Sequence, residues 1–338
     1  MLEMKSMAFD PLNYTLKIGY VPLIDSAPLL VAEKEGLFEK HGVHVTLSEE
    51  VGWATVRDKL IHKELDMAST LLGLPYAMHN GVGCYQTSMS IPLIMNANGN
   101  TITLTKSVTK EMFSNPELLA ATLNERAEPN GRKWTFATVN PYSSHLILLF
   151  QWLSKHLKNF ISEIDIVFLP PQLFPDLLEK GMIDGFCAGE PWGTQAEANG
   201  SGWIVGDSIS LNTNHPEKVL AVPKRTMDYH HDAVKSIGKA LLEALELCDS
   251  EAYRDQLIQT LCASPAMQLS GAEIETCLTR QFKNQEGEMQ FLHTFSGGET
   301  NTPTSEKEQW VLKGLKEAGL FRKKIIATGQ IMNSEVLF

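Results

Sequence analysis

Two series of alternating strand and helix patterns constrain what this chain can fold into. In the first, the two-residue alternation of 16–21 and of 43–47 flanks apolar residues at helical spacing. The second series begins after Arg132 and runs to Ala188 with the same order of patterns. Such alternation predicts parallel sheets with helices on both faces. Because there are two series, we expect an α/β protein with two lobes.

A short internal sequence similarity favours two related lobes. The segments 63–68 and 180–185 each close an amphipathic helix and place an aspartate, Asp66 or Asp184, at the start of a strand. A match of a few residues also arises by chance. If the similarity is real, each lobe presents an equivalent strand-to-helix loop, and ligands of open α/β sheets bind at such loops.

The chain is expected to leave the first lobe and return to it. We assign residues 15–105 plus 206–338 to a discontinuous lobe I and residues 106–205 to lobe II. The first crossing is expected within 106–131 and the return within 202–222. Two connections of this kind form a hinge, so a ligand cleft between the lobes can open and close.

The charge balance argues against two classes of partner. The 338 residues include 40 Asp and Glu against 29 Lys and Arg, which gives a formal charge of −11. Binding to nucleic acid or to an anionic membrane needs a clustered positive field. We therefore expect no direct contact with nucleic acid or with a membrane.

The cysteines and the N-terminal segment indicate a compartment. Five cysteines at 84, 187, 248, 262 and 277 are odd in number and unclustered, which favours reduced thiols over a disulfide framework or a zinc site. No basic segment followed by an apolar one opens the chain, and no run of about 18 apolar residues occurs. We expect a cytoplasmic protein, although removal of an export signal would leave the same pattern.

Motifs of assembled catalytic centres are absent from the sequence. Neither phosphate-binding glycine motif occurs, and HExxH, CxxC and GxSxG are missing as well. The adjacent His230 and His231 fit a solvated helix start better than a metal site. We expect no enzyme activity, no cofactor and no metal.

Several residues at predicted loop positions are candidates for the cleft. Trp53 can stack on a flat ligand or pack in the core, and Asn100 follows an Asn98-Gly99 turn pair. His145 lies in the presumed first turn of a helix, where an anion is favoured, but it can also cap or pack. Lys218 borders an apolar strand, where lysines are usually solvated.

These residues lie within motifs that closely resemble the nitrate- and bicarbonate-binding protein family, the NrtA- and CmpA-like solute-binding proteins of bacterial ABC transporters. The resemblance spans about residues 16–249 and implies a type II periplasmic-binding-protein fold, with two α/β lobes, hinge strands and a ligand cleft. A thiamine-precursor synthase of the same fold would need a cysteine cluster. The motifs are Leu16–Tyr20, Ala27–Leu29, Glu35–Gly42, Trp53–Lys59, Gly189–Trp192 and Asn214–Lys218.

The resemblance also implies a ligand set for a planar monoanion. Lys218 is expected to supply the charge, Asn100 and His145 hydrogen bonds, and Trp53 a donor and a wall. Asn100 is shorter than the glutamine of many nitrate binders, and no carboxylate set for the metal of bicarbonate binders is found. Lys218→Ala is expected to abolish binding and leave the fold intact. Residues expected around the ligand set are Gly99, Ser144, Glu190 and Pro191.

Within this family, the chain looks most like the cytoplasmic NasS-type nitrate/nitrite sensor. That resemblance implies control of nitrate-assimilation genes through a NasT-like partner, an RNA-binding antiterminator of the ANTAR type. The sensor is expected to sequester this partner and to release it when nitrate or nitrite binds. The alternative is a nitrate, nitrite or bicarbonate solute-binding component of an ABC transporter whose export signal was removed.

Overall fold

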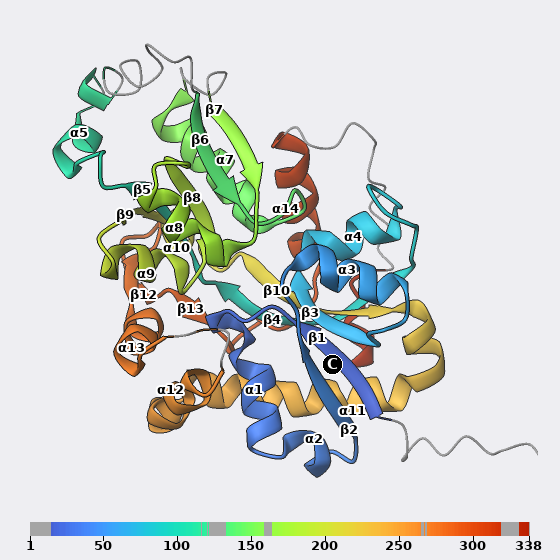
Figure 1. Ribbon diagram of the computed structural model, residues 1–338. Helices are drawn as coiled ribbons and strands as arrows, with labels where there is room; N and C mark the ends of the chain where they lie inside the picture. The colour runs from blue at the N-terminus through green and yellow to red at the C-terminus, as the bar shows by residue number, and fades with distance from the viewer. Residues whose placement is uncertain are drawn as a thin grey trace, which may run out of the picture.

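Two α/β halves make up the molecule (Figure 1). One is built on a six-stranded sheet and the other on a five-stranded sheet, and a two-stranded hairpin lies beside them. The computed structural model describes residues 15–115, 117–119, 121, 133–158, 164–264, 267, 269–318 and 331–337.

The larger sheet has the strand order β13-β4-β10-β3-β1-β2. β1 pairs in parallel with β2 and β3, whereas β10 runs antiparallel to both β3 and β4. Its strands are β1 (Thr15–Tyr20), β2 (His44–Glu49), β3 (Met67–Leu71), β4 (Met89–Asn98), β10 (Pro216–Pro223) and β13 (His293–Thr294). The helices of this half are α1 (Ala27–Lys34), α2 (Leu37–Lys40), α3 (Trp53–Ile61), α4 (Gly73–His79) and α11 (Lys224–Asp249).

The smaller sheet has the order β7-β6-β8-β5-β9. Its strands are β5 (Asn100–Thr105), β6 (Trp134–Thr138), β7 (Ile164–Phe168), β8 (Gly185–Gly189) and β9 (Gly202–Asp207). Its helices are α5 (Lys110–Ser114), α7 (Ser144–His156), α8 (Phe174–Glu179), α9 (Trp192–Ala198) and α10 (Ser208–Leu211). The chain then adds α12 (Arg254–Cys262), α13 (Gly271–Thr279), the hairpin β11 (Gln281–Lys283) and β12 (Met289–Phe291), and α14 (Ser305–Glu317).

The two sheets share one topology. The similar sequence segments 63–68 and 180–185 lie at equivalent positions in the two sheets. In the larger sheet β2, β1 and β3 run parallel, and the neighbouring strand β10 is antiparallel to β3. In the smaller sheet β7, β6 and β8 run parallel, and the neighbouring strand β5 is antiparallel to β8. The Asp66 carboxylate accepts a hydrogen bond from the Lys17 amide at 2.8 Å, and the Asp184 carboxylate accepts one from the Thr135 amide at 2.9 Å. The same contact therefore starts the third parallel strand of both sheets.

The chain first crosses between the sheets at Gly99, earlier than predicted. Asn98 and Gly99 have φ values of 62° and 98°, and the turn they form sends β5 into the smaller sheet, where it pairs with β8 and β9. A β-carbon at Gly99 would lie 3.0 Å from the His293 ring, so the position suits glycine. Residues 100–105, assigned to lobe I, thus belong to the second sheet. We propose the same division into two lobes, with the first crossing at Gly99 and the return crossing at 208–215.

Other differences from the predicted elements are local. The predicted helix at 117–126 falls largely outside the described residues. α11 begins at Lys224, ahead of the predicted 232, and bends at His230. Ser26 gives no cap to α1, because its hydroxyl donates to the Leu23 carbonyl at 2.7 Å. Among the described residues, no helix has the length and apolar character needed to cross a membrane.

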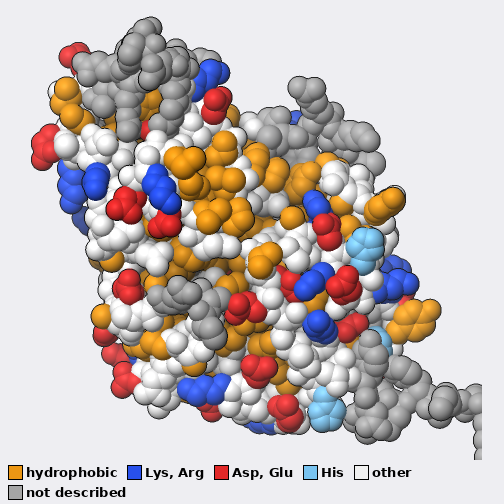
Figure 2. All heavy atoms as spheres, viewed as in Figure 1, with side chains coloured by type: hydrophobic (Ala, Val, Ile, Leu, Met, Phe, Trp, Pro, Cys, Tyr) orange, Lys and Arg blue, Asp and Glu red, His pale blue; other side chains and the backbone are white. Residues whose placement is uncertain are grey.

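Apolar side chains from both halves pack into one cluster. Leu71 and Leu74 of the larger half lie in it with Phe174, Phe186 and Trp192 of the smaller half. α14 adds a second bridge, since it packs against both α7 and α4. Figure 2 shows hydrophobic side chains gathered near the centre of this face of the molecule. Burial of this surface holds the two halves closed on one another.

Candidate ligand-binding site

Lys218 belongs to a central strand of the larger sheet. It is on β10 and fully buried, so the expectation that a strand-border lysine is solvated is wrong here. Its ammonium pairs with the carboxylates of Asp25 at 2.8 Å and Glu217 at 2.7 Å. The ammonium also lies 5.4 Å from the centre of the Trp53 ring, a cation–π distance.

A β-bulge places Glu217 beside Lys218. Adjacent residues of a strand normally face opposite sides of the sheet. In β10, however, Pro216 pairs with Ala97 and Lys218 with Asn96, so Glu217 is an extra residue opposite β4. A bulge of this kind redirects side chains. It accounts for two consecutive charged side chains that meet at 2.7 Å.

The carboxylate of Glu217 is the point on which the site converges. One oxygen, Oε1, is contacted by Lys218 and lies 2.9 Å from His145 Nε2. The other, Oε2, accepts from the Asn100 side-chain amide at 2.6 Å and from the Ser144 hydroxyl. Asn100 comes from β5 and the other two from α7, so donors of the smaller half surround a carboxylate of the larger half.

The local charges keep Glu217 ionised. Burial acts to raise the pKa of this carboxyl, but Lys218 and His145 outweigh it and hold the pKa well below the usual glutamate value. For Lys218, burial acts to lower the pKa, and the carboxylates of Asp25 and Glu217 raise it above its usual range. Burial raises the pKa of Asp25. The site therefore contains one ammonium that faces two carboxyl groups.

The N-terminus of α7 contributes a positive electrostatic potential near the Glu217 carboxylate. Ser143 caps the helix, with its hydroxyl accepting from the Leu146 amide at 3.2 Å, and Ser144 and His145 form the first turn. The N-terminus of a helix of 13 residues carries a partial positive charge that stabilises an anion. The Ser144 hydroxyl and the His145 ring of this first turn contact the Glu217 carboxylate.

Several buried polar atoms of the site have no hydrogen-bond partner among the described residues. They are Trp53 Nε1, Asn100 Oδ1 and His145 Nδ1. Buried polar groups in proteins are nearly always paired, and an unpaired one is costly. The site therefore has more hydrogen-bonding capacity than Glu217 uses.

Of the remaining predicted residues, Gly99, Glu190 and Pro191 lie at the edge of this cluster. Glu190 is fully buried, but its carboxylate accepts from the Thr101 hydroxyl at 3.0 Å and from the Thr194 amide at 2.9 Å. Its carbonyl accepts from the Ile24 amide at 3.1 Å, which fixes the turn that carries Asp25. Pro191 follows it directly and precedes α9. Gly99 forms the crossing turn next to Asn100, and Ser144 contacts the centre itself.

Two residues of the centre, Asp25 and Glu217, were not assigned to the site from the sequence. Asp25 precedes Ser26 and a helix with Pro28 in its first turn, a pattern typical of a capping residue. Glu217 should face away from Lys218 if β10 were regular. A signal was present nonetheless, because two adjacent charges before an apolar strand need partners once that strand is buried.

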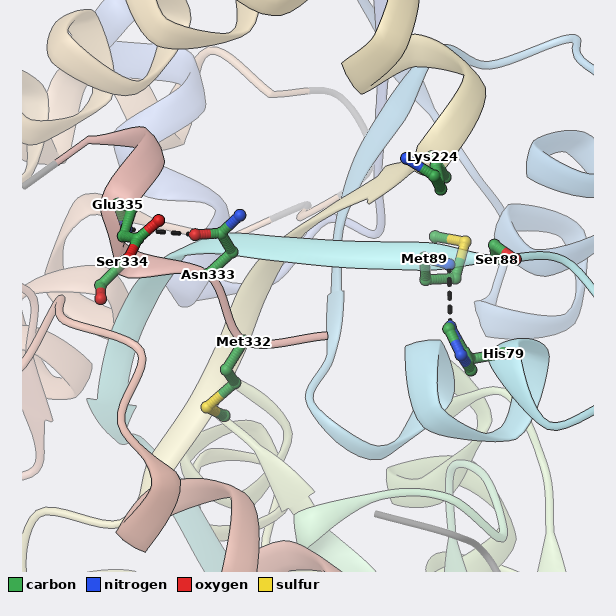
Figure 3. A pocket seen from close by; sticks show the side chains of 8 residues that line it. All are labelled: His79, Ser88, Met89, Lys224, Met332, Asn333, Ser334 and Glu335. Atoms are coloured by element: carbon green, nitrogen blue, oxygen red, sulfur yellow. Dashed lines mark hydrogen bonds between the residues drawn. The ribbon is translucent and has the colours of Figure 1, made fainter. Parts of the chain in front are cut away.

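A hollow of about 800 Å³ lies elsewhere, and none of the predicted ligand residues lines it (Figure 3). Two of its polar groups are already bonded, His79 with the Met89 amide at 3.2 Å and Asn333 with the Glu335 amide at 3.2 Å. In the described part of the chain, no three His, Cys, Asp or Glu side chains are grouped to hold a metal. The Glu217 cluster is thus the candidate site.

Comparison with known proteins places the chain in a family. The model of the NMT1-like family matches residues 10–262, which is most of the chain. The chain belongs to the NMT1-like family.

Relatives of this NMT1-like protein are transport proteins. It is 32% identical over 310 residues to the nitrate import ATP-binding protein NrtC of Synechocystis sp., covering 90% of this chain and 46% of that protein. It is 29% identical over 313 residues to the bicarbonate transport ATP-binding protein CmpC of Synechococcus elongatus, covering 90% and 45%. The chain thus spans about half the length of these curated relatives.

The fold of the NMT1-like chain is that of a periplasmic binding protein. The crystal structure of the periplasmic nitrate-binding protein NrtA from Synechocystis PCC 6803 superposes with a TM-score of 0.82 at 23% identity. The match covers 96% of this chain and 85% of that one. The predicted type II fold is confirmed, and these relatives are binding and transport proteins rather than thiamine-precursor synthases.

Proposed function

We propose that this chain binds nitrate or nitrite between its two halves. The observation that carries the proposal is the way in which the protein holds the Glu217 carboxylate. This planar, delocalised monoanion is contacted by one ammonium, one imidazole, one amide and one hydroxyl. Nitrate and nitrite are also planar monoanions with delocalised charge, so the same donors suit them. The similarity to the nitrate import ATP-binding protein NrtC and to the periplasmic nitrate-binding protein NrtA supports this ligand class.

The ligand residues of the proposal are those expected from the sequence: Trp53, Asn100, His145 and Lys218. Lys218 supplies the charge, and Asn100 and His145 approach from the opposite half. Trp53 offers an indole N–H that has no partner among the described residues. Because the donors come from both halves, bringing the halves together completes the site.

We expect calorimetric titration to detect the ligand directly. Nitrate, nitrite and bicarbonate would each be titrated into the full chain in a chloride buffer. Saturable one-to-one heat is expected with nitrate or nitrite, because the donors fit a planar monoanion and no metal-binding group accompanies them among the described residues. Heat with bicarbonate alone, or with none of the three, would contradict the proposal.

Beyond ligand binding, we propose that the chain is a cytoplasmic nitrate/nitrite sensor. It would sequester a NasT-like ANTAR antiterminator and release it on binding the ligand. All five cysteines lie in the described part of the chain, and all are free thiols, which suits a reducing compartment. The alternative, a solute-binding component of a nitrate, nitrite or bicarbonate ABC transporter, is supported by the names of the relatives.

Co-chromatography with the purified antiterminator of the same organism separates the two roles. A sensor is expected to elute with this partner, and nitrate should weaken the complex. By linkage, the partner must weaken nitrate binding by the same factor. A partner that does not bind, or that binds equally with and without nitrate, would contradict the sensor role and leave the transporter component.

A further inference from the structure

We propose that the Glu217 carboxylate is a resident anion of this site, and that an external anion binds by displacing it. The inference rests on the proposed function, because it describes how the nitrate or nitrite reaches its donors. It assigns to Glu217 the role of an internal competitor that sets affinity and selectivity.

The contacts of Glu217 use the same donors that an external anion needs. Its two oxygens are bonded by Lys218, His145, Asn100 and Ser144. Of the four ligand residues expected from the sequence, only Trp53 is not among these partners. An anion that engages this set must therefore take the place of the carboxylate.

A second anion beside Glu217 is strongly disfavoured. Glu217, Lys218 and His145 are each fully buried, so water screens their charges little. Burial and a neighbouring like charge both oppose ionisation. Since Lys218 already faces two carboxyl groups, an added monoanion would leave the site with excess negative charge.

The surroundings allow the carboxylate to move while the lysine stays in place. Lys218 keeps its ion pair with Asp25 at 2.8 Å when Glu217 turns away. His215 lies beside Glu217, with its Nδ1 3.8 Å from Glu217 Oε2 and bonded to the Pro216 carbonyl at 3.2 Å. Its Nε2 has no partner among the described residues and is the atom that can receive the displaced carboxylate. The bulge leaves Glu217 without a partner residue on β4, although its carbonyl accepts from the Leu72 amide at 3.2 Å, so any movement is that of the side chain.

Displacement has a thermodynamic consequence that can be measured. A site that is occupied internally is competent for external ligand only in the fraction of molecules where Glu217 has left, and the apparent affinity falls by that fraction. Removal of the carboxylate should therefore strengthen anion binding. Weakly coordinating anions would gain most, because the internal competitor excludes them most effectively.

The main variant is Glu217→Gln, and Asp25→Asn is its matched control. Each variant removes one carboxyl group within 2.8 Å of the Lys218 ammonium. Only Glu217 also contacts His145, Asn100 and Ser144. We expect nitrate and nitrite to bind Glu217→Gln at least about tenfold more tightly than the wild type, and more tightly than Asp25→Asn.

A second variant, Glu217→Ala, tests whether a carboxylate occupies the anion site, and it does so without nitrate. It opens a hole the size of the lost side chain, and acetate supplies a free carboxylate of that kind. Acetate is expected to raise the melting temperature of Glu217→Ala and to leave that of the wild type unchanged. This assay works even where the alanine variant is less stable, because each protein is compared with itself.

The outcomes separate the inference from the proposed function. If nitrate binds the wild type, Glu217→Gln binds it no more tightly and acetate has no effect on Glu217→Ala, the resident-anion inference is overturned while the proposed function stands. If acetate stabilises Glu217→Ala but nitrate and nitrite bind no variant, the inference stands and the proposed ligand is wrong. Gains of equal size in Glu217→Gln and Asp25→Asn would also overturn the inference, because they would reflect charge alone.

Discussion

Replacement of Lys218 by methionine is expected to lower the free energy of unfolding by about 3–5 kcal/mol and to abolish anion binding. The sequence predicted loss of binding with an intact fold, since a cleft lysine leaves no apolar cavity. The structure argues otherwise about stability, because the ammonium is buried and paired with Asp25 and Glu217. Its removal leaves two carboxylates without their cation in a place that water does not reach.

Urea unfolding followed by circular dichroism measures this effect. The control is the triple variant Lys218→Met, Asp25→Asn and Glu217→Gln, which removes all three charges together. Replacing a whole buried ion cluster by neutral groups is often close to neutral in stability. We expect the triple variant to recover most of the lost stability and to remain unable to bind nitrate. A single Lys218→Met variant as stable as the wild type would contradict the argument.

The repeated topology was predictable because its signals are local. Apolar alternation marked β1 and β2, and the aspartates at 66 and 184 marked the third parallel strand of each sheet. The strands β11, β12 and β13 were missed, since each has at most three residues and too short a pattern to recognise. The crossing at Gly99 was misplaced because two apolar strands joined by an Asn-Gly turn look like one hairpin.

The centre of the site was predictable only in part. The family resemblance supplied Asn100, His145 and Lys218, which the fold brings to one carboxylate. Glu217 was missed because strand periodicity assigns neighbours to opposite faces, and a bulge reverses that assignment. Asp25 was missed because a capping pattern and an inward-facing carboxylate look alike in sequence. In both cases the deciding contact joins residues distant in the chain.

The close approach of Gly73 to Tyr142 allows a test of whether anion binding depends on closure of the two halves. Gly73 is the first residue of α4 in the larger half, and Tyr142 lies just before α7 in the smaller half. A β-carbon at Gly73 would lie 2.4 Å from the Tyr142 carbonyl oxygen and 2.8 Å from the Leu315 side chain. The carbonyl is backbone and cannot rotate away, so relief requires the halves to separate.

Gly73→Ala is therefore expected to weaken anion binding by about 5- to 150-fold, which corresponds to a penalty of about 1–3 kcal/mol on the closed form. Alanine favours a helix more than glycine does, so the helix itself is not weakened. The site loses affinity because Asn100 and His145 move away from Lys218 when the halves part. Calorimetry gives the affinity, and small-angle X-ray scattering with nitrate should show a larger radius of gyration than that of the wild type.

The matched control is Gly271→Ala, at the first residue of α13. A β-carbon there meets Ile258 at 3.5 Å, which is ordinary contact, so neither the affinity nor the scattering should change. In the sensor proposal, the partner binds the ligand-free form with separated halves. Gly73→Ala favours separated halves and should therefore also retain the antiterminator in the presence of nitrate. Wild-type affinity and wild-type scattering in Gly73→Ala would mean that the site does not depend on closure.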